Sequence, residues 1–252
     1  MKKIILVSIL AIFVTACNKS EPVVKKSDNA GICHDKTSGS YKRLENYTGF
    51  KTMAACLASG GVLPKNQQND GKEDTSPSNN NQGTSTAYTP PSKEYEREFF
   101  GHSWIDEDKD CMNTRHEILV SQALNGSAKP KSDNDCQIAV GQWKSPFTDE
   151  IITSAAAIDI DHIAPLKFAW TYGAEKWSEK KRLQFANDPE NLLAVEASLN
   201  RSKGAQDITE WLPPKNQCNY ITQFLTISAK YDLVFPQNKL SAFEAVRKTH
   251  CS

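Results

Sequence analysis

The sequence has 252 residues, of which 38% are hydrophobic, and its 30 basic and 30 acidic side chains give a formal net charge of zero. This length suits one main domain and a smaller unit, and the balanced charge excludes a polycation that binds nucleic acid or membranes through net charge alone. The seven cysteines are more typical of an oxidising compartment than of the cytosol.

Residues 1–16 have the pattern of an export signal. Two lysines precede an apolar run at residues 4–14, which is shorter than the roughly 20 residues that a membrane-spanning helix needs. The ending V-T-A-C at residues 14–17 resembles a bacterial lipobox. This resemblance implies lipidation of Cys17 and stable anchoring by two or three acyl chains, and Asn18 then implies the outer membrane. An ordinary cleaved secretory signal is the alternative.

A polar tether is expected at residues 17–30, followed by a small accessory module at residues 31–64. The module is too small to bury a sufficient core unaided, so a disulfide between Cys33 and Cys56 is expected to stabilise it. His34 beside Cys33 is compatible with metal ligation, but a disulfide-stapled module is the favoured interpretation.

Residues 65–92 are poor in apolar residues and rich in Asn, Gln, Ser, Thr, Gly and Pro, a composition that predicts a disordered linker. The main domain is expected over residues 93–252, where we count 19 basic and 23 acidic side chains. A nucleic-acid binder with this acidic excess needs a local basic patch, a cation, or both.

Six cysteines remain once Cys17 is set aside, and their distribution among the predicted units suggests how they pair. None forms a C-x-x-C motif, which argues against a zinc site. The expected disulfides are Cys33–Cys56, Cys111–Cys136 and Cys218–Cys251.

The acidic run at residues 106–110 is interpreted as a solvated loop, with calcium binding as the alternative. In the block C-M-N-T-R-H-E-I-L that follows at residues 111–119, Thr114 and Glu117 form a capping-box pattern that predicts a helix start. Arg115 is a candidate phosphate contact, because its guanidinium can bind phosphate with two donors. A structural ion pair of Arg115 is equally compatible with the sequence.

Residues 136–141 and 151–154 predict a hairpin that packs against the segment after it. A helix is then expected after Ser178, a favoured N-cap residue, and the neighbouring aromatic side chains are interpreted as core rather than as base-stacking platforms. Nearer the C-terminus, helical spacing predicts an amphipathic helix over residues 220–231 that covers the sheet, and a last helix near residues 240–249.

The segment 159–203 carries the most specific pattern of the chain. D-I-D-H-I-A-P-L at residues 159–166 predicts a strand that ends before Pro165, and N-L-L-A-V at residues 191–195 predicts a second buried strand. A helix starting at Ser198 or Asn200 is expected next. Adjacent strand residues point to opposite faces, so the aspartate and histidine of D-H can share a site only near the strand end.

This strand, strand, helix order resembles the ββα-metal finger of the HNH endonuclease superfamily, in the variant with Asp161 and Asn200 in place of the outer histidines. Five blocks extend the resemblance to the HNH nucleases of secreted bacterial proteins related to the C-terminal domain of GmrSD restriction enzymes. It implies an α+β domain in which a ββα-metal finger is embedded in a small antiparallel sheet with packed helices. The blocks are residues 111–119, 161–166, 187–195, 200–204 and 210–214.

The residue types and the resemblance imply the same chemistry. His162 would be the general base, since imidazole titrates near neutral pH. Asp161 and Asn200 offer the oxygen ligands that suit Mg²⁺ or Mn²⁺. By resemblance, Asn191 fixes the loop that orients the base. Lys203 is expected to neutralise phosphate charge, and a solvated residue at the helix start is the alternative.

Two further residues have open roles. Asp159 is expected to support the metal ligands without binding the metal itself. Arg201 is either a phosphate contact or a solvated residue at the helix start. For the pair Asp161 and His162 alone, a strand-end histidine capped by aspartate is the alternative interpretation.

Three functions follow from these patterns. The leading one is a membrane-tethered, metal-dependent endonuclease that hydrolyses DNA, with RNA as a further substrate, and with little sequence preference because no base-reading helix is apparent. The alternatives are a catalytically degenerate module that binds nucleic acid in the cell envelope, and a structural envelope lipoprotein. No obligate protein partner is evident from the sequence.

Overall fold

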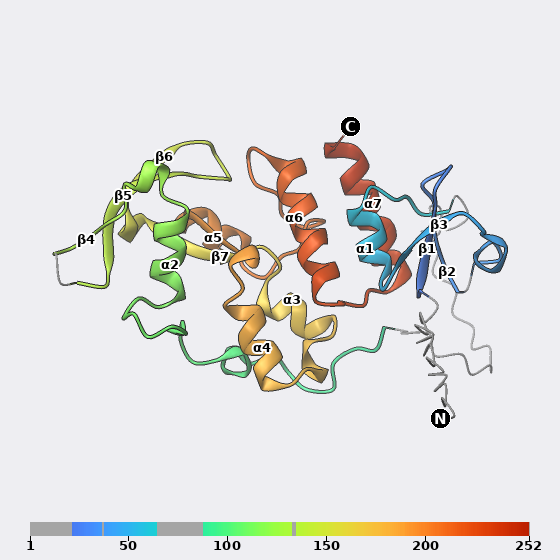
Figure 1. Ribbon diagram of the computed structural model, residues 1–252, viewed down its shortest axis with the longest axis horizontal. Coiled ribbons are helices and arrows are strands. Elements are labelled where there is room, and N and C mark those ends of the chain that lie inside the picture. Colours follow the sequence, from blue (N-terminus) through green and yellow to red (C-terminus); the bar gives the residue numbers. More distant parts are fainter. Residues whose placement is uncertain (1–21, 37, 65–87, 133–134, 252) are drawn as a thin grey trace, which may run out of the picture.

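The computed structural model describes residues 22–36, 38–64, 88–132 and 135–251. Figure 1 shows the N-terminal sheet at one end of the long axis and the hairpin of β5 (Ile138–Lys144) and β6 (Ile151–Ser154) at the other. Helix α6 (Gln217–Lys230) lies between them. The arrangement is α+β: small antiparallel sheets lie beside packed helices. Within the described part of the chain, no helix is both long and apolar enough to cross a membrane.

The accessory module is a three-stranded antiparallel sheet of order β2-β1-β3, with helix α1 packed on it. The predicted disulfide Cys33–Cys56 joins β2 to α1. The sequence prediction placed Val24 in the tether, but it lies in the central strand, because its side chain is buried in the core. The elements are β1 (Val24–Ser27), β2 (Cys33–Asp35), β3 (Tyr47–Phe50) and α1 (Met53–Ala58).

The module shares a continuous apolar core with the main domain, because α1 packs against α6. Arg247 on α7 donates a hydrogen bond to the carbonyl of Gly61, 3.0 Å away. Helix α6 was expected to cover the sheet. Its buried face instead meets α1 and α7, since Phe224 and its neighbours pack into the aromatic core.

Four helices, which we call the helical half, build that aromatic core: α3 (Leu166–Thr171), α4 (Glu179–Ala186), α6 (Gln217–Lys230) and α7 (Gln237–His250). Ser178 caps α4 as predicted and accepts a hydrogen bond from the amide of Lys181. Trp170 and Phe185 are buried, which confirms them as core residues. The predicted disulfide Cys218–Cys251 ties α6 to the end of α7.

A second, smaller core lies under helix α2 (Thr114–Ser121), between the hairpin and the next strands. The hairpin strands are β5 (Ile138–Lys144) and β6 (Ile151–Ser154), with the short β4 (Lys129–Pro130) beside β5. Strand β5 runs further than predicted because Trp143 is buried and donates to the carbonyl of Leu119. The cap of α2 is Asn113 rather than Thr114, which is the first helical residue. The predicted disulfide Cys111–Cys136 closes this region.

The centre of the domain contains β7 (Ile158–His162), β8 (Leu192–Glu196) and α5 (Ala197–Lys203), which we call the ββα unit. The two strands are antiparallel and paired along their whole length. Strand β8 starts one residue after Asn191, and α5 starts at Ala197, earlier than the predicted Ser198 or Asn200. The order strand, strand, helix is therefore as expected.

Candidate active site

The pairing of β7 with β8 places Asp161 opposite Leu193 and His162 opposite Leu192, at the end of the strand. Adjacent side chains on a strand point to opposite faces. Because β7 ends at His162, both residues nevertheless line one cavity of about 330 Å³. Other lining residues come from α3, α5 and the segment around η3 (Arg97–Phe100), and include Tyr95, Arg97, Lys167, Asn200 and Lys203.

Asp161 is buried and forms an ion pair with Lys203. The Lys203 ammonium lies 2.7 Å from Oδ1 of Asp161 and 2.8 Å from the carbonyl oxygen of His162. Burial raises the pKa of the Asp161 carboxyl, while the Lys203 ammonium acts in the opposite direction. From the sequence, Lys203 was expected to neutralise a substrate phosphate. In the structure its ammonium is fully buried and pairs with the Asp161 carboxylate instead.

The ring of His162 is held from two sides. Its Nε2 lies 2.8 Å from the carbonyl oxygen of Ala186, and the ring stacks on Trp104 with centroids 5.5 Å apart and planes 13° from parallel. A carbonyl oxygen only accepts, so Nε2 carries the proton and Nδ1 is the nitrogen that can take one. Burial lowers the pKa of His162 to about 3, so the imidazole is neutral at physiological pH.

Asn191 joins the end of β7 to the start of β8. Its fully buried side chain accepts a hydrogen bond from the amide of Ala164 at 2.9 Å and donates one to the carbonyl of the same residue at 3.3 Å. Its carbonyl oxygen also accepts from the amide of Ile163. These bonds fix the turn that follows His162.

Asn200 and Asp159 lie together on the α5 side of the strands. The amide nitrogen of Asn200 donates to Oδ2 of Asp159 at 3.2 Å, and Arg201 lies 3.9 Å from the same oxygen with its side chain exposed. Asp159 thus orients the side chain of Asn200. The amide oxygen of Asn200 has no hydrogen-bond partner among the described residues.

The donor set fits a hard divalent cation. Oδ2 of Asp161 is buried without a hydrogen-bond partner in the described part of the chain, although Oδ1 of the same carboxylate is paired. A buried carboxylate oxygen normally has a partner, so this atom is one that a cation or ordered water would satisfy. Asn200 can add an amide oxygen, and both ligand types suit Mg²⁺ or Mn²⁺.

Arg115 lies outside this cavity. Its guanidinium donates to the carbonyls of Ala155 and Ile158, at 3.1 and 2.8 Å. It therefore supports the start of β7 from α2. Among the described residues Arg115 has no ion-pair partner, and it does not line the cavity.

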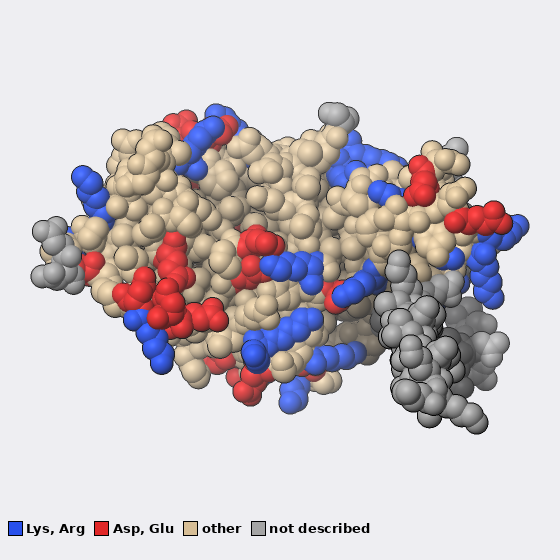
Figure 2. Space-filling model, in the orientation of Figure 1, with Lys and Arg blue, Asp and Glu red and all other residues tan. Residues whose placement is uncertain are grey.

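Several carboxylates of the acidic loop before α2 lie together on the surface (Figure 2). Asp106, Asp108 and Asp110 are exposed, and their carboxylates offer oxygens that all lie within 4.8 Å of one another. With Glu117 they occupy the spacing of acidic ligands in a calcium loop, although Cys111 replaces the usual glycine, at a φ of 77°. Burial and then these aspartates raise the pKa of Glu117. Exposed acidic groups are also common without an ion, so both sequence interpretations remain.

Three cavity or site residues were missed by sequence reasoning: Trp104, Arg97 and Tyr95. They lie on the segment before α2, far from the D-H pair in sequence, and no local pattern connects them to it. The carbonyl of Ala186 that holds His162 was missed for the same reason.

Comparison with known proteins shows the family of the chain. A family model described as "GmrSD restriction endonucleases, C-terminal domain" matches residues 90–240, which include α2 and the whole ββα unit. The chain belongs to this family.

An uncharacterized secreted protein of Arthroderma benhamiae is 34% identical over 163 residues, which are 63% of this chain and 77% of that protein. This relative is fungal, whereas the sequence resemblance pointed to bacterial proteins. No solved structure matches. Membership of the GmrSD C-terminal family indicates a nuclease-related function.

Proposed function

We propose that this protein is a divalent-metal-dependent endonuclease of the HNH type, which hydrolyses phosphodiester bonds in DNA or RNA with little sequence preference. The observation that carries the proposal is the unpartnered, buried Oδ2 of Asp161 in the same cavity as a neutral histidine. The order of β7, β8 and α5 and the family match support it.

Each residue of the site has one task in this proposal. His162 takes a proton from the attacking water at Nδ1, as the water oxygen bonds to phosphorus and the bond from phosphorus to the 3′ oxygen breaks. The 3′ oxygen leaves with the electron pair of that bond and takes a proton from solvent. Asp161 and Asn200 hold the cation, which when bound offsets negative charge on the phosphate. Lys203 keeps the Asp161 carboxylate ionised and aligned. Asn191 fixes the turn after the base.

The low pKa of His162 has two consequences for a base. The imidazole is ready to accept a proton at neutral pH, but in the free protein it is a weak base, because burial opposes its charged form. An anionic phosphate in the cavity stabilises the imidazolium and so strengthens the base when substrate is bound. The stacked ring of Trp104 and the carbonyl of Ala186 keep the imidazole in place meanwhile.

The test is cleavage of supercoiled plasmid and single-stranded DNA by the disulfide-bonded chain in Mg²⁺, in Mn²⁺ and in EDTA. His162→Ala is expected to abolish a metal-dependent activity. The matched control is His250→Ala, which removes an exposed histidine at the end of α7 and is expected to cut normally. Cleavage that survives His162→Ala would show that the base is wrongly assigned.

A catalytically degenerate binding module is the second candidate. The observation that favours it is the Lys203 ammonium on Oδ1 of Asp161, which already neutralises the proposed ligand. Salt-sensitive binding of DNA without cleavage in any of the metals would select this candidate over the endonuclease.

We also infer export and a lipid anchor. Three disulfides are typical of oxidising compartments, and the relative from Arthroderma benhamiae is described as secreted. The signal peptide at residues 1–16, Cys17 and most of the linker at residues 65–92 lie outside the described residues, so they remain predictions. Fractionation of cells that express Cys17→Ser tests the anchor: this variant is expected to leave the membrane fraction.

A further inference from the structure

One rim of the cavity is built from outside the ββα unit. Tyr95 and Arg97 reach it from the segment around η3, and Lys167 reaches it from α3. Asp161 is the only carboxylate among the described lining residues, and it is already paired with Lys203. The rim therefore presents unneutralised positive charge to whatever enters.

The backbone that carries Arg97 is held firmly. Phe100 is buried and packs against Phe185, and Phe99 stacks on Trp170 with ring centroids 4.7 Å apart. Arg182 on α4 donates to the carbonyl of Phe99 at 2.8 Å. A well-anchored backbone places the base of the Arg97 side chain at a defined point of the rim.

The side chains of Arg97 and Lys167 have no acidic partner. Both residues are exposed, and neither forms an ion pair within the residues that the structure describes. Arg97 does form a hydrogen bond with the side chain of Tyr95, a neutral group that also lines the cavity. Arg97 also lies near enough to the base to act on it: after burial and the Ala186 carbonyl, its charge is the next influence on the pKa of His162. An exposed guanidinium without a carboxylate, beside a base in a cavity, suits an anion with several oxygens.

We propose that Arg97, together with Lys167, binds a backbone phosphate of a nucleic-acid strand at this rim. The proposal rests on the proposed function, because it names how the same cavity holds its substrate. The guanidinium offers a phosphodiester two parallel donors, and the Lys167 ammonium on the same rim adds positive charge. A phosphate held there presents the strand to His162 without relying on net positive charge, which this domain lacks.

The test is binding of a fluorescent single-stranded oligonucleotide to the full chain carrying His162→Ala, by anisotropy over a range of NaCl concentrations. Adding Arg97→Ala is expected to weaken binding about tenfold at low salt and to reduce the salt slope by about 0.7, the value for one phosphate on a single strand. Arg97→Lys is expected to restore the slope but only part of the affinity.

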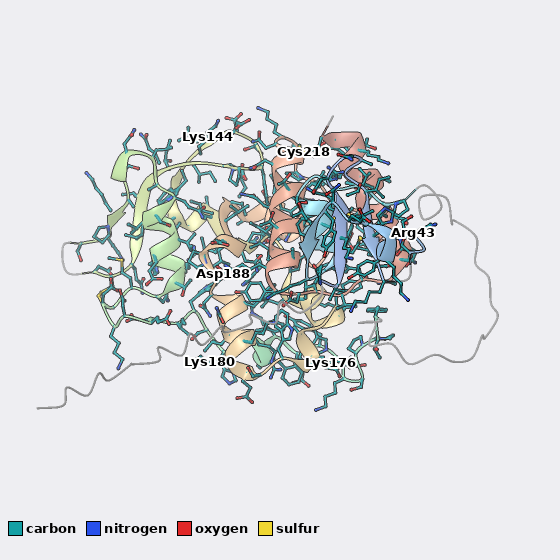
Figure 3. The ribbon with its side chains drawn as sticks, turned by 45° about the vertical axis from the view of Figure 1, so that its right-hand side comes forward. Arg43, Lys144, Lys176, Lys180, Asp188 and Cys218 are labelled. Atoms are coloured by element: carbon teal, nitrogen blue, oxygen red, sulfur yellow. A yellow bond between two sulfur atoms is a disulfide. The ribbon has the colours of Figure 1, made fainter. Side chains whose placement is uncertain are left out.

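Lys180→Ala is the matched control. This exposed lysine of α4 does not line the cavity, and Figure 3 shows it at the edge of the molecule opposite Lys144. Removing it is expected to change neither affinity nor slope. In the wild-type background, Arg97→Ala is expected to raise KM for the oligonucleotide about tenfold with kcat within twofold.

The outcomes separate this inference from the proposed function. If wild type and Arg97→Ala cut DNA equally well, the rim site is overturned and the proposed function is not. A chain that binds but never cuts in any metal overturns the endonuclease, and the salt slopes then still decide the role of Arg97. Equal slopes for Arg97→Ala and its parent contradict the inference in either case.

Discussion

The ββα unit and the helical half bury very different side chains. Around the ββα unit, Asp161, His162, Asn191 and Lys203 are all buried and held by polar partners. In the helical half, aromatic rings pack on one another, as Phe224 does between Phe168 and Phe243. Buried charges seldom increase net stability, whereas buried aromatic rings do. The helical half therefore supplies the stability with which the ββα unit can keep a polar site.

The two regions are joined through Asp188, which lies inside the molecule between them (Figure 3). Its carboxylate caps the turn before Asn191, accepts a hydrogen bond from Tyr231 at 2.8 Å, and pairs with Lys230 at 2.7 Å. The end of α6 thereby fixes the segment that orients the proposed base.

Removing one partner of the buried ion pair is expected to have the largest effect. Lys203→Met keeps a similar volume but leaves the Asp161 carboxylate buried without its cation, so the free energy of unfolding is expected to fall by about 4 kcal/mol. Urea unfolding measures this loss, and cleavage should disappear too. Adding Asp161→Asn should recover much of the stability but none of the activity. If the free energy of unfolding of Lys203→Met lay within roughly 1 kcal/mol of the wild-type value, the contrast between the ββα unit and the helical half would be lost.

A similar exchange in the helical half is expected to cost less and to leave the chemistry intact. Phe224→Met keeps an apolar side chain of similar size, so the predicted loss is about 1.5 kcal/mol, with cleavage rates within twofold of wild type. A large loss of kcat in folded Phe224→Met would show that the aromatic core also controls the site.

Trp104→Leu is expected to separate positioning from stability. Because Trp104 is only partly buried and stacks on His162, its loss should lower kcat about tenfold with little change in KM or in the unfolding midpoint. Trp104→Phe retains a flat ring and should keep most of the activity. Equal kcat values for wild type and Trp104→Leu would show that the stack does not position the base.

The smallest expected effect is a pH dependence from His116. The Nδ1 of His116 accepts a hydrogen bond from the amide of Ile138 at 3.0 Å, and burial, followed by the Arg115 charge, lowers the pKa of this histidine. Its contribution to stability is thus present above the unfolded value near 6.5 and is lost as the pH falls toward the folded value.

His116→Asn keeps an acceptor that does not titrate. The difference in unfolding free energy between wild type and this variant should therefore change between pH 7 and pH 5. The effect is small because the imidazole is only partly buried. A constant difference across this range would mean that His116 is not the titrating group.

The features that depend on neighbouring residues could be predicted from local sequence patterns. The D-H pair at a strand end, the Ser178 cap and the three disulfides follow from residue type and spacing, and the structure contains each of them. The start of α2 was misplaced by one residue because both Asn113 and Thr114 are good N-cap residues, and only the backbone conformation distinguishes them.

Tertiary contacts were not predictable in this way. The burial of Lys203 depends on where α5 lies against β7, and the stack of Trp104 on His162 joins residues from separate elements. The packing of the accessory module on α6 likewise depends on a shared core that neither segment encodes alone. Contacts of this kind leave no periodic signal in one sequence.

The most direct test of the account is the rate of DNA cleavage as a function of Mn²⁺ concentration for wild type, Asp161→Asn and Asp108→Asn. Asp108 belongs to the other group of carboxylates that could hold an ion, so its variant controls for that loop. The account predicts the same saturation curve for wild type and Asp108→Asn, and a loss of about a hundredfold or more in Asp161→Asn. Identical curves for wild type and Asp161→Asn would contradict a catalytic cation at Asp161.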